Sequence, residues 1–286
     1  MKMKIFTMPE EMQAWATAQK AAGRTIGLCP TMGALHEGHM TLMRAAKEAS
    51  DIVIASVFVN PTQFAPGEDY EKYPRQFRED CEKLAREGVD AVFHPEPAAM
   101  YPAGFGTYVT PDCAETQVLE GARRPIHFRG VATVVTKLMN ITRADRAFFG
   151  QKDAQQIAVV RRCVEDLNLP VQVTMVPICR EESGLARSSR NAYLRPAERK
   201  AATVLSRSLR KAETAFTAGE RSAERLVALV QEELAGEPLA RVDYVALRTF
   251  PGLQPVTEVR ETCLLALAVF IGTTRLIDNA ILEGEA

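Results

Sequence analysis

Residues 30–39 read Pro30-Thr31-Met32-Gly33-Ala34-Leu35-His36-Glu37-Gly38-His39. The short apolar run 25–29 before them is typical of a buried strand. Behind them, Leu42, Met43 and Ala46 follow helical spacing. The stretch therefore predicts a strand that enters a tight turn and then a helix over 40–49.

The composition of this turn indicates an anion-binding site. Gly33 and Gly38 allow the backbone to approach a ligand closely. The free N–H groups at the start of the new helix favour an anion. His36 and His39 share a face if the turn is already helical, and their imidazoles can donate to phosphate oxygens. A histidine pair at this spacing is by itself usually solvated, but the whole unit predicts a site for a nucleotide phosphate chain. Its spacing fits neither the P-loop nor the dinucleotide fingerprint.

The first two thirds of the chain alternate strand and helix patterns, which indicates an α/β fold with a doubly wound, Rossmann-like parallel sheet. The run 51–59 is almost entirely apolar, as in a parallel strand covered on both faces. Ligands bind such sheets beyond the carboxyl ends of the strands, where Pro30, Asn60 and Gly150 are expected. Further strands are predicted at 90–94, 147–149 and 171–178, and helices at 10–22, 74–87, 130–143 and 153–167.

The pattern changes after Cys179. A polar, turn-rich segment leads into a predicted amphipathic helix over 196–218, and Ser222 is a candidate N-cap for a second helix. Strands are predicted at 242–247 and 263–271. We therefore expect a first domain over 1–179 and a smaller α+β domain over 180–286.

Composition narrows the function. The 286 residues carry a net charge of −1 with both signs interspersed, which argues against a nucleic-acid surface. No apolar run approaches the roughly 20 residues that span a bilayer, and residues 1–5 lack a signal-peptide core. The six cysteines form no CxxC motif, as expected of free thiols in a reducing compartment. These features predict a cytoplasmic small-molecule enzyme without a membrane or nucleic-acid partner.

Other polar residues add to the predicted site. Lys152 stands where a strand turns into a helix, on the rim that carries the two histidines, and Asp153 could cap that helix or hold a ribose. The amides of Gln63 and Gln156 suit a hydroxy acid, because they donate to carboxylate and accept from hydroxyl. Each of these residues alone also fits an ordinary surface position.

Two further clusters differ in what they predict. Two hydroxyls and a guanidinium in the run Ser188-Ser189-Arg190 can wrap a triphosphate, although a solvated loop fits as well. The acidic residues 69, 71, 79, 80 and 82 lack calcium or zinc spacing and are expected to form a solvated face. No protein metal site is predicted, and Mg²⁺ is expected to enter with ATP.

Residues 30–39 resemble the HIGH-type signature of the nucleotidyltransferase superfamily, in the form found in the pantothenate synthetase (pantoate–β-alanine ligase) family. Five more blocks resemble this family and follow its order, across nearly the whole chain: FVNPTQF (58–64), RPIHFRGV (124–131), FGQKDAQQ (149–156), SSRN (188–191) and RLIDN (275–279).

The resemblance implies an ATP-dependent ligase that condenses (R)-pantoate with β-alanine through pantoyl adenylate, within pantothenate and coenzyme A biosynthesis. AMP and pyrophosphate would be released, and the first domain would form a homodimer. It implies catalytic roles for His36, His39, Lys152 and Arg190. Pantoate would contact Gln63, Gln156 and Asn60, and β-alanine would contact Gln63. The implied ATP contacts are Met32, Gly33, Ala34, Leu35, His36, Glu37, Gly38, His39, Gly150, Gln151, Lys152, Asp153, Cys179, Arg187, Ser188, Ser189 and Arg190.

The chain departs from the family pattern at two positions. Gln151 stands where the family often has Glu, and Arg187 stands where Leu is usual, so its cation could strengthen phosphate binding or face solvent. The roles of His127 and Arg129 stay open. Two other functions fit the first motif: a nucleotidyltransferase that adenylylates a phosphorylated metabolite, and a nucleotide-sensing module without turnover.

Overall fold

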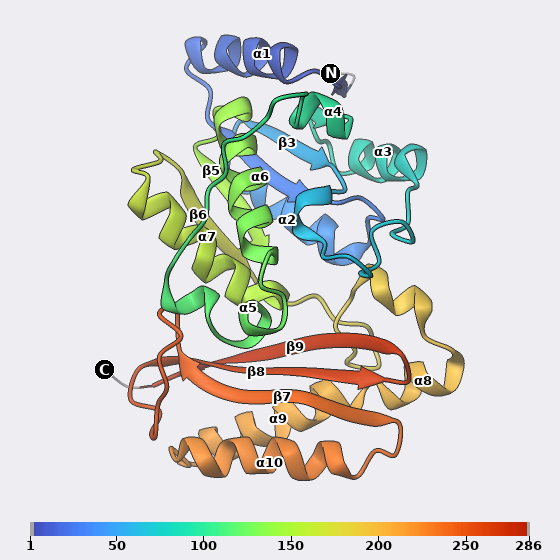
Figure 1. Ribbon diagram of the computed structural model, residues 1–286, viewed down its shortest axis with the longest axis vertical. Coiled ribbons are helices and arrows are strands. Elements are labelled where there is room, and N and C mark those ends of the chain that lie inside the picture. The colour runs from blue at the N-terminus through green and yellow to red at the C-terminus, as the bar shows by residue number, and fades with distance from the viewer. Residues whose placement is uncertain (1–2, 285–286) are drawn as a thin grey trace.

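A computed structural model describes residues 3–284 and contains a six-stranded parallel sheet in the order β1-β4-β3-β2-β5-β6 (Figure 1). The strands are β1 (Lys4–Phe6), β2 (Ile26–Thr31), β3 (Ile52–Val57), β4 (Ala91–Phe93), β5 (Arg146–Gly150) and β6 (Gln172–Val176). Strand order reverses at β2, because β3 and β4 lie on one side of it and β5 and β6 on the other. A ligand crevice is expected where β2 and β5 end. The predicted doubly wound sheet is confirmed.

Helices cover both faces of this sheet. On one face Leu28 and Ile54 pack with α1 (Pro9–Ala21), α6 (His127–Thr142) and α7 (Ala154–Asp166). On the other face Cys29 and Val53 pack with α2 (Glu37–Ala49) and α3 (Phe77–Arg86). Successive residues of a strand point to opposite faces, so both sets are buried. This double burial explains the unbroken apolar runs.

The second half forms an antiparallel sheet of β7 (Ala240–Thr249), β8 (Thr262–Ile271) and β9 (Thr274–Glu283). α9 (Val204–Thr217) and α10 (Ala223–Ala235) cover its far face, so the sheet lies between them and the first half (Figure 1). Leu265 and Leu267 of β8 join the core under these helices, whereas Leu264 and Ala266 join the core of the first half. The predicted α+β character is confirmed; the boundary at 179/180 stays a prediction.

Some predicted elements differ from the structure. The helix expected over 196–218 is divided into α8 (Pro196–Ala201) and α9, because Thr203 and Leu205 bond to carbonyls three residues back rather than four. β1 and β9 were not predicted, although a turn with Gly272 at φ +59° links β8 to β9. Six short helices were also not predicted: α4 (Pro97–Met100), α5 (Leu119–Arg123), η1 (Pro61–Gln63), η2 (Ala114–Thr116), η3 (Gln151–Asp153) and η4 (Ser189–Tyr193). The other elements differ mainly at their ends.

Candidate active site

The turn between β2 and α2 is held by a buried carboxylate from α3. Asp80 is fully buried and accepts hydrogen bonds from the backbone N–H groups of Ala34 (2.9 Å) and Leu35 (2.8 Å). Ala34 has a φ of +51°, which residues other than glycine seldom adopt, whereas glycine adopts the +83° of Gly33 readily. The expectation of a solvated acidic face was therefore wrong for Asp80, which offsets the strain of this turn through two charge-assisted hydrogen bonds.

The two histidines cap α2 with their Nδ1 atoms. Nδ1 of His36 accepts from the backbone N–H of Gly38, and Nδ1 of His39 accepts from the backbone N–H of His36, each at 3.2 Å. An imidazole nitrogen that accepts carries no proton, so both rings are Nε2–H tautomers. The ring centroids are 4.1 Å apart. The pair therefore offers two neighbouring N–H donors.

Both rings are neutral at neutral pH. Burial, followed by the charges of Lys152, Arg187 and Lys83, lowers the pKa of His36 to about 4. Burial, reinforced by His36, lowers the pKa of His39 well below its usual value. Gly38 lies against the ring of His36, which the sequence did not suggest. A Cβ at Gly38 would lie 3.0 Å from Cε1 of His36, so the glycine also makes room for the ring.

Gln63 comes from η1, which packs closely against α6. A Cβ at Gly130 would lie 2.4 Å from the carbonyl oxygen of Thr62 and 2.5 Å from Cα of Gln63, so only glycine fits there. His127 adds a tether: its Nε2 accepts from Arg124, so its Nδ1–H donates to the carbonyl of Gln63 at 3.1 Å. Burial, followed by the charge of Arg124, lowers the pKa of His127 to about 4. His127 thus positions Gln63.

Asn60 orients the side chain of Gln63. Its Nδ2 donates to Oε1 of Gln63 (3.0 Å) and to the carbonyl of Gly130 (3.1 Å), while its Oδ1 accepts from the hydroxyl of Tyr101 (2.7 Å). Asn60 was expected to bind pantoate, but the structure commits its polar atoms to protein partners. Because Oε1 of Gln63 already accepts a hydrogen bond, the amide Nε2 is the group that Gln63 presents. Within residues 3–284, its one hydrogen-bond partner is the sulfur of Met32, at 3.2 Å.

Lys152 follows β5 in η3, and β9 of the second half fixes its backbone. Nδ2 of Asn279 donates to the carbonyls of Gln151 (2.9 Å) and Lys152 (3.0 Å), and Nε2 of Gln151 returns a bond to Oδ1 of Asn279 at 3.2 Å. Nζ of Lys152 lies 3.2 Å from Oδ1 of Asp153. Asp153 occupies the N-cap position of α7, but its side chain makes no capping bond.

The run Ser188-Ser189-Arg190 docks against the segment 69–73 of the first half. Nε and Nη2 of Arg190 each lie 3.1 Å from the carboxylate of Asp69, and the hydroxyl of Tyr73 lies 3.2 Å from that of Ser189. Sequence reasoning missed Asp69 and Tyr73 as partners, because 121 and 116 residues separate the paired positions.

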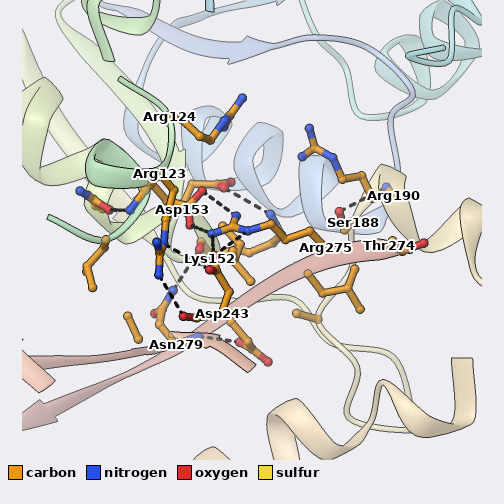
Figure 2. A pocket seen from close by; sticks show the side chains of 18 of the residues that line it. Arg123, Arg124, Lys152, Asp153, Ser188, Arg190, Asp243, Thr274, Arg275 and Asn279 are labelled. Carbon is orange, nitrogen blue, oxygen red and sulfur yellow. Dashed lines mark hydrogen bonds and ion pairs between the residues drawn. The ribbon is translucent and has the colours of Figure 1, made fainter. Parts of the chain in front are cut away.

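Two adjoining cavities bring the candidate residues together. A cavity of about 220 Å³ lies beyond the ends of β2 and β5, and a cavity of about 810 Å³ lies between the halves (Figure 2). Lys152, Asp153, Gln156, Ser188 and Arg190 line both. The predicted residues that line only the smaller cavity are Met32, His36, Gly38, His39, Asn60, Gln63, Gly150, Cys179, Arg187 and Ser189.

Five predicted ATP contacts line neither cavity: Gly33, Ala34, Leu35, Glu37 and Gln151. The backbone of the first three forms the turn that Asp80 holds, Glu37 pairs with Arg44, and the side chain of Gln151 bonds Asn279. Among residues 3–284, no group of three His, Cys, Asp or Glu side chains is placed to hold a metal ion.

Comparison with known proteins identifies the family. A sequence profile described as "Pantoate-beta-alanine ligase" matches residues 4–281. The chain belongs to the pantoate–β-alanine ligase family. It is 52% identical to a pantothenate synthetase of Carboxydothermus hydrogenoformans over 281 residues, covering 98% of this chain and 99% of that protein.

Solved structures of this family share the fold. The pantothenate synthetase of Thermus thermophilus superposes with a TM-score of 0.92 at 42% identity, covering 99% of this chain and 100% of that one. The pantoate–β-alanine ligase of Francisella tularensis, described as complexed with "Beta-gamma ATP" and β-alanine, gives a TM-score of 0.80 at 33% identity, covering 98% and 97%. The chain is thus similar to ligases of the family over essentially its whole length.

Proposed function

We propose that this chain joins (R)-pantoate to β-alanine in an ATP-dependent reaction that passes through pantoyl adenylate and releases AMP and pyrophosphate. Family membership over nearly the full length supports the ligase activity. The main support for the adenylate route is that four donors line one cavity of about 220 Å³. They are the imidazoles of His36 and His39, the amine of Lys152 and the amide of Gln63. Phosphate-binding and carboxylate-binding groups there face the same space.

The first half-reaction needs donors where negative charge develops. A carboxylate oxygen of pantoate attacks the α-phosphorus, and the bond to the bridging oxygen of pyrophosphate breaks. The Nε2–H groups of His36 and His39, with the ammonium of Lys152, offset charge that builds on the departing oxygens. Because both histidines are neutral and fixed by the backbone, they donate without reorganising.

The same cavity supports the second half-reaction. The amide Nε2–H₂ of Gln63 donates to pantoate, and Gln156 from the start of α7 supplies a second amide. The amine of β-alanine, held beside Gln63, attacks the acyl carbon of the adenylate. The nitrogen gives up a proton to solvent, and AMP leaves with the electron pair of the broken bond. Asn60 is then a positioning residue that keeps Gln63 turned as a donor.

Further features of the proposal concern the surroundings of the site. We infer that Mg²⁺ arrives with the ATP phosphates, since it keeps several waters and needs few protein ligands. The nucleotide lies between residues 1–179 and the smaller domain 180–286, with Ser188, Ser189 and Arg190 closing on the outer phosphates. We also infer a homodimer in the cytoplasm. No helix among residues 3–284 is long and apolar enough to cross a membrane.

Isotope exchange between pyrophosphate and ATP tests this proposal. Exchange is expected when pantoate is present, and it needs no β-alanine, because the adenylate forms and reverts without the second substrate. Complete turnover should yield AMP, pyrophosphate and pantothenate in equal amounts. Accumulation of ADP without exchange would overturn the adenylate route. A stable dinucleotide product would indicate a nucleotidyltransferase, and ATP binding without any turnover would indicate a nucleotide sensor.

A further inference from the structure

Arg187 differs from the other arginines that line the two cavities. Its backbone N–H donates to the carbonyl of Cys179 at 3.0 Å, which fixes where the side chain begins. Within residues 3–284 its guanidinium has no hydrogen-bond or ion-pair partner, and its Nε is a buried donor without an acceptor. By contrast, each of the other lining arginines lies against a carboxylate: Arg123 against Asp243, Arg124 against Glu68, Arg190 against Asp69 and Arg275 against Glu120.

An unpaired, partly desolvated cation is unfavourable unless something else pairs with it. The surroundings of Arg187 add to this cost, since Lys152 lines the same cavity and both histidines there are neutral. Stacking against a flat ring would leave the Nε–H without an acceptor. The geometry therefore calls for an acceptor at Nε that residues 3–284 do not supply.

The division between the two cavities shows which part of the nucleotide Arg187 meets. Arg187 and Gln63 line only the smaller cavity, whereas Lys152, Ser188 and Arg190 line both. Transfer of the adenylyl group requires the α-phosphorus to lie against the carboxylate of pantoate. Because Gln63 is proposed to hold pantoate, the α-phosphorus lies in the smaller cavity. The oxygen that bridges the α- and β-phosphates then lies by His36 and His39, still in the smaller cavity, and the outer phosphates extend from there toward the residues that the cavities share. Arg187 is left beside the adenylyl portion.

We propose that Arg187 binds the AMP portion of the nucleotide, with its Nε–H donating to an acceptor there. This inference rests on the proposed adenylate chemistry. The contact is present in ATP, persists in pantoyl adenylate after pyrophosphate has left, and ends only when AMP departs. Arg187 thereby retains the activated acid in the cavity while β-alanine reacts, a task that residues reaching only the outer phosphates cannot perform.

The test compares how a variant of Arg187 binds AMP and pyrophosphate, the two products of ATP cleavage. In the full-length protein, Arg187→Leu should weaken the binding of AMP, measured by calorimetry, about tenfold, and ATP by a similar factor, since a charge-assisted hydrogen bond is lost. The affinity for inorganic pyrophosphate should not change. Without nucleotide, the variant should melt at the same temperature as the unsubstituted protein or higher, because a buried donor without an acceptor has been removed.

Two further variants control for charge and for the substitution itself. Arg187→Lys keeps a cation but lacks Nε, so it should bind AMP with intermediate affinity. Arg78→Leu removes a guanidinium whose side chain is 94% exposed on α3 and should change neither affinity. The binding of adenosine to Arg187→Leu shows which atom accepts the hydrogen bond. If the affinity for adenosine is unchanged, the acceptor is on the phosphate. If it falls as much as the affinity for AMP, the acceptor is on the base or the ribose. Either result supports contact with the AMP portion.

Three results would overturn the inference: unchanged AMP affinity, loss of pyrophosphate affinity alone, or equal loss for both ligands, which would indicate a general field of positive charge. Failure of the proposed function is a separate observation. It would appear as absent pantoate-dependent exchange in the unsubstituted protein, whatever the AMP affinities of the Arg187 variants.

Discussion

Two segments supply donors to the proposed phosphate site, and they are held in different ways. The turn before α2 is held by the fully buried carboxylate of Asp80 and by the reciprocal caps of His36 and His39. The run 188–190 is held by the Asp69–Arg190 ion pair, in which the two side chains are 24% and 31% exposed. Water can replace the second set of contacts far more easily than the first.

This difference assigns different tasks to the two segments. Donors that act on developing charge work best when they are fixed before the reaction, as the two imidazoles are. Nε and Nη2 of Arg190 already bond the carboxylate of Asp69, and in the proposed function Arg190 releases Asp69 when it turns to the phosphates of ATP. The fixed turn thus suits the chemical step, and the exchangeable ion pair suits capture and release of the nucleotide.

The largest effect is expected at the fixed turn. In His39→Asn, Oδ1 can still accept from the backbone N–H of His36, but the donor at the Nε2 position is lost. Pantoate-dependent exchange should fall about 10²- to 10³-fold, as when one donor at developing charge is removed. His39→Gln, which restores a donor near that position, should recover part of the rate. An unchanged exchange rate in His39→Asn would refute the assigned role.

A smaller effect is expected at the support of that turn. Asp80→Asn offers one acceptor oxygen to two backbone N–H groups, so one buried hydrogen bond is weakened or lost. Denaturant titration should show the free energy of unfolding lowered by about 1–3 kcal/mol. Glu79→Gln, at the exposed neighbouring position, is the matched control. Equal stability of the two variants would show that Asp80 does not hold the turn.

The smallest effect is expected at the exchangeable ion pair. Asp69→Asn should lower the free energy of unfolding by less than about 1 kcal/mol, because partly exposed pairs contribute little. The KM for ATP should fall a few-fold, since Arg190 no longer has to leave a carboxylate. Steady-state kinetics against Glu71→Gln, an exposed neighbour, measures this change. A raised KM would mean that Asp69 presents Arg190 correctly instead of competing for it.

Local sequence patterns predict part of this fold and site, and contacts between distant segments supply the rest. The order of strands and helices, the anion-seeking turn and the residue types around it follow from local patterns, because period, caps and glycines act over a few positions. No local pattern predicted the structural roles of Asp80, Tyr101 and Gly130. Each acts on a segment 40 or more residues away along the chain. The division of the helix expected over 196–218 was also missed, since both parts keep one amphipathic pattern.

The sequence by itself determined the parallel α/β sheet, the family and most of the polar groups of the site. Only the tertiary structure decided what each group can do: that the histidines are neutral Nε2–H donors, that Gln63 presents its amide nitrogen, and that Arg187 lacks the carboxylate its counterparts have. The reason is physical. Protonation, orientation and pairing depend on burial and on partners from distant segments, and those partners meet only when the chain has folded.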